Sequence, residues 1–439
     1  MSTQRVVITG LGVVSPIGCD LEALWDSLMA GRSGIAPITG MPTESLPVKA
    51  GAEVKDFTGD IENYGPLDKS LQRSIKKNMK VMCREIEMGV AAAQKALTHS
   101  GLSADRTPER CGCLFGCDYI LTRPEEFADG LRNCRQQAQA GNDNLAGWVS
   151  DWPVHGLPKV NPLWLLKYLP NMPNSHVSIY NDFRGPNNAI TVREASMNLS
   201  LAEAASIIQR GAADVMLVGA TGTRIHPLRS MHVTLTEPYA SHQDDPSTMS
   251  RPFDASCDGF VLGEGAGAIM LESLEHAKGR GAKLWGEIVG FSSSMTGPAP
   301  GRDHLRQAIG HSLKTTYSRA SGAIGQQWHL HAHGLSTQEA DTAEAGAIAD
   351  LLDSLGYQIP VTAAKSYFGN LGAGSGAIEL VCSLLALQHQ QLFPIRNLKR
   401  PMASVTWPAA QGGSQPGQGF IHSSFTLQGQ AASIAVATI

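Results

Sequence analysis

Short, nearly apolar runs alternate along this chain with longer segments in which apolar residues recur every three or four positions. The runs at 5–14 (RVVITGLGVV), 111–117 (CGCLFGC) and 214–221 (DVMLVGAT) have the length and composition of buried strands. The segments at 79–97 and 194–210 have the spacing of helices that pack on one face. This alternation predicts an α/β fold, in which helices cover the faces of a sheet.

The same pattern starts again near residue 283. LWGEIVGFSSS at 284–294 has an apolar opening, a glycine and polar turn residues, in the order found in the chain's first strand. The similarity of sequence is weak, and it predicts two similar α/β halves at about 1–280 and 281–439.

The region 118–180 is less regular than the rest of the chain. It contains Trp148 and Trp152, several proline and asparagine residues, and no sustained period. We expect an inserted cap of loops and short helices over the layered core, and a return to a strand at HVSIY, 176–180.

Charge and cysteine content argue against several classes of protein. The 35 Lys and Arg residues are balanced by 39 Asp and Glu residues, so the net charge of −4 favours neither nucleic acid nor an anionic membrane as a partner. The eight cysteines are too scattered for a disulfide framework, and Cys111, Cys113 and Cys117 are interpreted as small buried strand residues and not as metal ligands. The N-terminus has no signal-peptide pattern and no run reaches about 18 apolar residues, so we expect a cytoplasmic protein.

Four segments carry a family resemblance. They are RVVITGLGVVSPIG at 5–18, RPFDASCDGFVLGEGAGAIMLE at 251–272, HAHGLSTQEADTAEAGAI at 331–348 and KSYFGNLGAGSGAIEL at 365–380. In order and spacing these segments resemble the β-ketoacyl-acyl-carrier-protein synthases, condensing enzymes of the thiolase fold. The resemblance implies two similar halves in five layers, αβαβα, a dimer, and chemistry that needs no cofactor and no metal.

A carboxylic acid occupies the position of the family's nucleophile. In this family a Cys at the start of a buried helix attacks an acyl thioester, and it follows a Gly-Pro-Asn triplet after six residues. Here the triplet lies at 185–187 and the residue in the Cys position is Glu194. The helix dipole that would lower the pKa of a thiol also keeps a carboxylate ionised, and an acyl anhydride on Glu194 would hydrolyse easily. The acyl-accepting thiol is therefore missing, which argues against ordinary condensation.

The other catalytic positions of the family are partly kept. The first family His matches His333, the second is replaced by Asn370, and the family's lysine is Lys365. The resemblance implies that the first two positions donate hydrogen bonds to the enolate formed when a malonyl thioester loses CO2. The charged residues expected to support them are Asp341, Glu344 and Glu379. The substrate-binding or gating positions are Thr337, Phe425 and Leu427, the last two beside a closing loop that has lost two of the family's glycines.

A buried carboxylate at a helix start needs a cationic partner, because an unpaired buried charge costs several kcal/mol. We therefore expect Glu194, His333 and Lys365 to approach one another in the interior, with Asn370 close by. The side chain of Arg193 is expected to point elsewhere.

Two functions remain open at this point. The first is a non-condensing partner subunit, similar to the chain-length factors that lack the Cys, pair with an active synthase and shape its acyl tunnel. The second is an enzyme that acts on malonyl or acyl thioesters without a covalent acyl-Cys, as a decarboxylase or with Glu194 as a base. The resemblance implies an acyl carrier protein or acyl thioester as a partner, and either a homodimer or a heterodimer with a Cys-containing synthase. The strand at 189–192 would lie near the dimer seam, since an apolar edge strand needs covering.

Overall fold

The chain folds around one large sheet flanked by helices, and the computed structural model describes residues 4–140, 151–241, 244–297 and 302–439. The strands in these ranges are β1 (Val6–Val14), β2 (Ile35–Pro37), β3 (Ala50–Ala52), β4 (Cys111–Cys117), β5 (Asn187–Ile190), β6 (Val215–Thr223), β7 (Glu264–Ser273), β8 (Gly286–Met295), β9 (His329–His331), β10 (Val361–Thr362), β11 (Gly419–Phe425) and β12 (Gln430–Ala437). The α-helices are α1 (Leu21–Met29), α2 (Lys69–Asn78), α3 (Arg84–Ser100), α4 (Glu125–Ala140), α5 (Met172–Asn181), α6 (Ser196–Gln209), α7 (Pro227–Thr236), α8 (Leu274–Gly279), α9 (Arg302–Ile324), α10 (Gln338–Leu355), α11 (Lys365–Phe368) and α12 (Gly374–His389).

The large sheet consists of two five-stranded parts with the same connectivity. Its order is β10-β9-β11-β12-β8-β1-β7-β6-β4-β5, so β1, β4, β5, β6 and β7 occupy the positions that β8, β9, β10, β11 and β12 occupy in the other part. The orientations agree as well, since β1–β7 and β8–β12 are antiparallel while β4–β6 and β9–β11 are parallel. The parts join where β1 pairs antiparallel with β8 over only three residue pairs.

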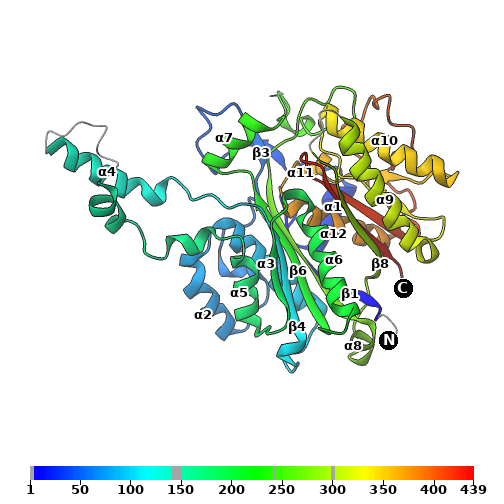
Figure 1. The fold of residues 1–439 in the computed structure, drawn as a ribbon, viewed down its shortest axis with the longest axis horizontal. Coiled ribbons are helices and arrows are strands. Elements are labelled where there is room, and N and C mark those ends of the chain that lie inside the picture. The colour runs from blue at the N-terminus through cyan, green and yellow to red at the C-terminus, as the bar shows by residue number, and fades with distance from the viewer. Residues whose placement is uncertain (1–3, 141–150, 242–243, 298–301) are drawn as a thin grey trace.

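Helices fill the space between the two parts of the sheet and cover both outer faces (Figure 1). Helices α6 and α12 contact strands of both parts, α3 and α5 pack on the first part, and α9 with α10 covers the second. This arrangement is the five-layered αβαβα thiolase fold that the resemblance implied.

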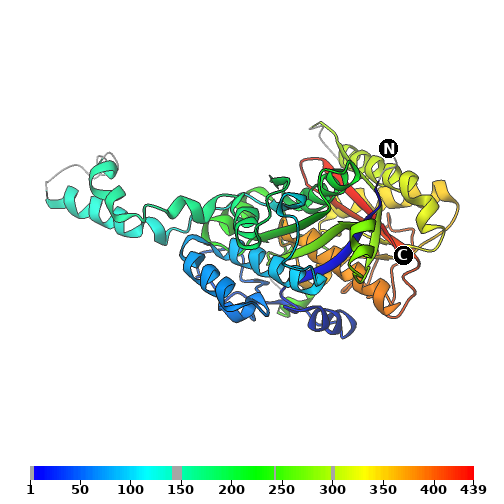
Figure 2. The ribbon, with the colours of Figure 1, turned by 90° about the horizontal axis from the view of Figure 1, so that it is seen from below.

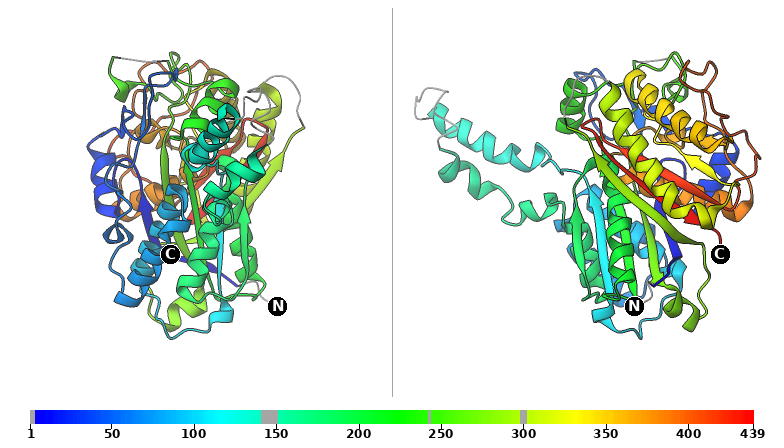
Figure 3. Two further views of the ribbon diagram at one scale, coloured as in Figure 1. Left: turned by 90° about the vertical axis from the view of Figure 1, so that its left-hand side faces the viewer. Right: turned by 45° about the vertical axis from the view of Figure 1, so that its right-hand side comes forward.

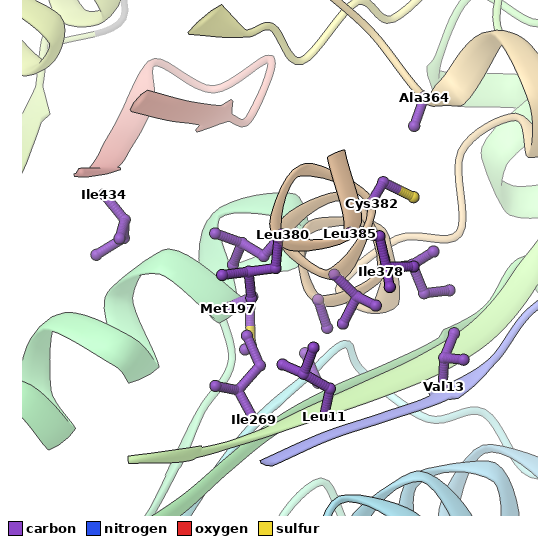
Figure 4. Packing of buried hydrophobic residues seen from close by; sticks show 14 of the residues in the cluster. Leu11, Val13, Met197, Ile269, Ala364, Ile378, Leu380, Cys382, Leu385 and Ile434 are labelled. Atoms are coloured by element: carbon purple, nitrogen blue, oxygen red, sulfur yellow. The ribbon is translucent and has the colours of Figure 1, made fainter. Parts of the chain in front are cut away.

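The central layer is an apolar core built around α12. Figure 4 shows Ile378 and Leu380 of this helix beside Met197 of α6 and Leu11 of β1, and all four side chains are buried. On the other face of β1, glycine permits close approach of α3: a Cβ atom at Gly12 would lie 2.1 Å from the Ala92 carbonyl oxygen. The buried small residues along α3 therefore let the outer helix layer lie directly on the sheet.

Part of the region 118–180 forms an arm. In Figures 1, 2 and 3, α4 and the short helical turns after it extend away from the layered body instead of covering it as the cap we expected. Phe127 of α4 holds these segments together through edge-on contacts with Trp152 and Trp164, at ring-centroid distances of 5.9 and 5.0 Å. Trp148 lies outside the described residues.

The predicted strand at 176–180 is wrong, since these residues belong to α5. Pro173 occupies the first turn of this helix, where its missing N–H costs nothing. The buried residues Pro173, His176, Val177 and Asn181 recur at helical spacing and face the body of the protein. The short apolar run was ambiguous, and packing on α3 and β4 decides for the helix. Among the described residues, no helix is both long and apolar enough to cross a membrane.

Candidate active site

Glu194 lies where the chain turns from β5 into α6. A short 3-10 turn, Arg193–Ala195, precedes the helix, and Arg193 has a φ of 47°, in the left-handed region that is strained for a residue with a Cβ atom. This turn directs the Glu194 side chain into the interior, where the residue is only 5% exposed. The structure thus places a carboxylate at the buried helix start, as the sequence predicted.

Two arginines and a second glutamate surround that carboxylate. Arg224, one residue beyond β6, pairs with Glu194 Oε1 and also lies 3.3 Å from Glu237 Oε2. Arg193 pairs with Glu237 too, and its Nε lies 3.9 Å from Glu194 Oε2. We call these four residues, Arg193, Glu194, Arg224 and Glu237, the arginine ring. Burial by itself would raise the pKa of Glu194, but Arg224 and then Arg193 hold that pKa well below its usual range, so Glu194 is ionised.

Lys365 is not the partner of Glu194, and this prediction was wrong. Its ammonium group donates to Glu379 Oε1 at 2.5 Å, to His333 Nδ1 at 3.0 Å and to the His333 carbonyl oxygen at 3.1 Å. These contacts use all three protons of a group that is 1% exposed. The expectation for Arg193 was wrong as well, because its guanidinium group belongs to the ring around Glu194.

The contact with Lys365 determines the tautomer of His333. An ammonium group can only donate, so Nδ1 of His333 accepts and the ring proton lies on Nε2. Burial and the positive charge of Lys365 lower the pKa of His333 to about 3, which keeps the imidazole neutral at physiological pH. Nε2 is buried and has no hydrogen-bond partner in the described structure. His333 therefore presents one unused N–H donor, the kind of group that stabilises a developing oxyanion.

Glu379 connects the lysine to the central helices. Its second oxygen, Oε2, lies 2.9 Å from His422 Nε2 on β11, and His422 Nδ1 lies 2.9 Å from Asn198 Oδ1 on α6. Burial would raise the pKa of Glu379, but Lys365 and His422 hold it well below the usual range. We call Lys365, His333, Glu379 and His422 the lysine network. His422 and Asn198 were missed in the sequence, because they lie in a strand and a helix outside the four motifs.

Asn370 lies close to Glu194, as predicted. Its amide nitrogen donates to Glu194 Oε1 at 3.0 Å, and its Oδ1 accepts from the Gly372 N–H at 3.0 Å. Asn370 thus contributes a hydrogen bond to the buried Glu194 carboxylate.

Asp341 and Glu344 support the site through the backbone and not through the lysine network. Glu344 accepts from the N–H groups of His333 and Gly334, both at 2.8 Å. Asp341 accepts from the N–H groups of Leu335 and Phe253, at 2.9 and 2.8 Å. Both carboxylates therefore fix the loop that carries His333, while burial raises the pKa of Asp341 to about 6 and that of Glu344 to about 8.

Of the three expected gating positions, Phe425 contacts His333. Phe425, at the end of β11, lies with its ring centroid 4.4 Å from that of His333. Leu427 follows in the tight turn to β12 and is half-buried, and Thr337 is buried with a hydroxyl that has no partner. Their roles toward a substrate stay predictions. Among the described residues no cluster of His, Cys, Asp and Glu could hold a metal ion.

Arg224 and Glu237 are the functional residues that sequence reasoning missed. One signal was available, because an arginine that directly follows the apolar strand DVMLVGATGT has to be buried or to lie at the mouth of a site. Their distance from Glu194 along the chain, 30 and 43 residues, hid the connection.

Comparison with known proteins identifies the family. A family model of the β-ketoacyl synthase N-terminal domain matches residues 3–277, and one of the C-terminal domain matches residues 285–399. The 3-oxoacyl-[acyl-carrier-protein] synthase 2 of Coxiella burnetii is 33% identical over 409 residues, which cover 91% of this chain and 90% of the relative. The corresponding protein of Synechocystis is 32% identical over 407 residues, covering 91% and 89%.

Solved structures show the same fold. The ishigamide ketosynthase/chain length factor superposes with a TM-score of 0.80 and 23% identity, with all of both chains covered. A β-ketoacyl synthase from Burkholderia phymatum gives a TM-score of 0.81 and 24% identity, with 99% of this chain and 100% of that chain covered. The family models span most of the sequence and the curated relatives match along nearly all of it, so the chain belongs to the β-ketoacyl synthase family.

Proposed function

We propose that this protein is a non-condensing member of its family, which acts as a chain-length-factor-like partner of a Cys-containing synthase in fatty-acid or polyketide-type synthesis. One observation carries the proposal: the residue in the nucleophile position is an ionised carboxylate that is paired with Arg224 and hydrogen-bonded to Asn370. Attack on a thioester by a carboxylate held in this way would break a buried ion pair with Arg224.

The same contacts argue against the alternative of a decarboxylase or a Glu194 base. A base has to reach the proton that it removes, and both oxygens of Glu194 already face arginines. An incoming malonyl carboxylate would also find both arginines of the ring already paired with Glu194 and Glu237. We therefore expect no CO2 release above background when the protein alone is incubated with a malonyl thioester.

The proposed partner requires a surface, and β5 offers a backbone edge for it. Among the residues that the structure describes, this strand pairs only with β4, and Asn187 and Asn188 are exposed. An open edge strand is a template for pairing with a second chain. The ishigamide protein that shares this fold is a ketosynthase/chain length factor, and a pairing of those two kinds of subunit is what we propose for this chain.

The test mixes the purified protein with a Cys-containing β-ketoacyl synthase and with acyl- and malonyl-loaded carrier protein. We expect no acyl adduct on this chain and no ketoacyl product from it alone, but a stable heterodimer and product when the two are combined. Ala189→Arg on β5 should abolish the heterodimer in size-exclusion chromatography, whereas Glu275→Arg, an exposed position on α8, should not. A stable acyl group on any cysteine of this chain, or product from it alone, would contradict the proposal.

A further inference from the structure

Charged side chains continue inward from the arginine ring. Arg229, on α7, pairs with Asp118 just beyond β4, lies 3.4 Å from Glu85 Oε1 and donates to the Tyr119 carbonyl oxygen at 2.8 Å. Glu85, Asp118 and Arg229 are at most 3% exposed. We call these three residues the second cluster.

The ring and the second cluster meet beside Gly372. A Cβ atom at this glycine would lie 2.9 Å from Asp118 Oδ2, 3.6 Å from Arg224 Nε and 3.8 Å from Arg229 Nη2. One point in the interior is thus within 4 Å of charged atoms from both groups. The seven side chains form one continuous body of charge, from the start of α6 to the start of α3.

The charges in this body balance. Burial, opposed by Arg229, raises the pKa of Glu85 to about 8, so this carboxyl group is mostly protonated at neutral pH. Three guanidinium groups, of Arg193, Arg224 and Arg229, then face the three carboxylates of Glu194, Glu237 and Asp118. A neutral, mutually paired set is the form in which buried charge is tolerated.

This body of charge occupies the space that an acyl chain would need. An acyl group carried by a side chain at position 194 has to extend beside that side chain, where Asn370 and Arg224 contact one carboxylate oxygen and Arg193 lies near the other. Arg224 fills the gap between the carboxylates and the Phe260 ring, with its guanidinium carbon 5.2 Å from the ring centroid. An apolar chain that entered here would have to displace a paired charge.

A cavity borders the second cluster at the base of the arm. It has a volume of about 270 Å³, and Glu85, Thr223 and Ile225 are among the residues that line it. Thr223 and Ile225 flank Arg224 in sequence, so the chain segment that carries this arginine borders the cavity, while its guanidinium group pairs with Glu194.

We propose that Arg193, Glu194, Arg224, Glu237, Asp118 and Arg229 form an ionic plug, which excludes acyl chains from the interior of this subunit, so that restoring the thiol at position 194 does not by itself restore acylation. This inference rests on the proposed non-condensing function and deepens it. In this proposal Arg224 excludes acyl chains from the site even when a cysteine is present at position 194.

The test compares Glu194→Cys with the double variant Glu194→Cys/Arg224→Met. The single variant leaves the ring with an extra positive charge, whereas the double variant retains the balanced pair Arg193–Glu237. Each protein is incubated with octanoyl-N-acetylcysteamine, an uncharged thioester. The sulfur at position 194 attacks the carbonyl carbon, the octanoyl–sulfur bond to N-acetylcysteamine breaks, and N-acetylcysteamine leaves as the thiol with the proton from Cys.

Mass spectrometry of the intact protein and of its peptides measures acylation at position 194, and the eight native cysteines of the wild type give the background. We expect acylation of the double variant to be faster than that of the single variant by about tenfold or more, because only the double variant has lost the plug's central cation. Equal rates would overturn the proposal. An unacylated double variant would overturn it as well, whether or not iodoacetamide in a parallel reaction alkylates the new thiol.

A second pair of variants needs no new cysteine. Glu194→Gln/Arg224→Met keeps the charges balanced, and Glu203→Gln/Arg210→Met removes an exposed ion pair from the same helix region as a matched control. The uncharged fluorescent probe N-phenyl-1-naphthylamine should bind the first variant and be displaced by octanoyl-N-acetylcysteamine, but should bind neither the control nor the wild type. Binding to the wild type, or none to Glu194→Gln/Arg224→Met, would overturn the plug. Neither result would touch the proposed function, which fails only if the wild type itself accepts or condenses acyl groups.

Discussion

The lysine network and the arginine ring lie at the same site but differ in what they leave unpaired. In the network, Lys365 donates its three protons to Glu379 and His333. Because His333 accepts at Nδ1, its proton lies on Nε2, which has no hydrogen-bond partner among the described residues. In the ring, two guanidinium groups and two carboxylates neutralise one another. One half of the site thus presents an N–H donor, while in the other half the charged groups are paired with one another.

The two clusters also differ in where their residues come from. His333, Lys365 and Glu379 belong to two short motifs, on β9 and its following loop, α11 and α12. The ring draws on the turn before α6, the end of β6 and the end of α7. Three members of the lysine network can therefore be located from sequence motifs, whereas the partners of Glu194 come from segments that no motif marks and that only the fold brings together.

The largest effect that we predict is on the ring. Arg224→Met removes the cation shared by Glu194 and Glu237, and leaves two buried carboxylates with only Arg193 between them. We expect the free energy of unfolding to fall by about 4–5 kcal/mol, the upper end of the range for breaking a buried pair. Urea unfolding monitored by circular dichroism measures this loss.

The control is Arg306→Met, which breaks an ion pair with Asp350 whose side chains are both close to half exposed. Its cost should stay below about 1 kcal/mol, as is usual for surface pairs. Equal losses for the two variants would show that the ring is not a buried structural unit.

The second prediction concerns the network. Lys365→Met leaves Glu379 with only His422 as a partner and removes the donor to His333 Nδ1. We expect a loss of about 3–4 kcal/mol, smaller than that of Arg224→Met because one carboxylate and not two loses its cation. The same urea experiment applies, and a variant with an unchanged unfolding midpoint would contradict a buried Lys365–Glu379 pair.

The fold could be predicted much further than the ring. The strands at 5–14, 111–117 and 214–221 were evident because both of their faces are buried, which leaves nearly continuous apolar runs. The helix at 176–180 was missed because five residues cannot show a period that distinguishes helix from strand.

For the candidate site, the sequence predicted where Glu194 lies but not which cation pairs with it. The spacing after Gly-Pro-Asn located Glu194 at a buried helix start, and Asn370 was expected beside it. The cation was misassigned to Lys365, because choosing between Lys365 and Arg224 requires the side-chain directions at the end of β6, which no local pattern encodes.

The third prediction tests the contact between the ring and the second cluster. Gly372 has a φ of 64°, and an added Cβ would crowd Asp118 Oδ2 at 2.9 Å. Gly372→Ala should cost about 2–3 kcal/mol, the sum of left-handed strain and overpacking. Gly356→Ala is the matched control, since its φ of 72° is similar but nothing lies within 4 Å of the new Cβ. It should cost only about 1–2 kcal/mol, and equal costs would remove the evidence that charged atoms crowd this point.

The smallest effect that we predict is a loss of stability at low pH, and it should be the same for the arginine ring and the lysine network. The pKa values of Glu194 and Glu379 are held well below their usual range in the folded protein, by different cations. A carboxylate of this kind contributes stability above its unfolded pKa of about 4.3, and the contribution is lost as the pH falls toward the folded value, at a cost of about 1–2 kcal/mol per group between pH 5 and pH 3.

Glu194→Gln and Glu379→Gln should each flatten this part of the stability curve by the same amount, although both variants are less stable than the wild type at pH 7. Urea midpoints at pH 3, 4 and 5 provide the measurement, with the exposed Glu62→Gln as the control that keeps the wild-type slope. If only Glu379→Gln flattened the curve, Glu194 would be protonated in the folded protein, and the charge balance of the ring would have to be rejected.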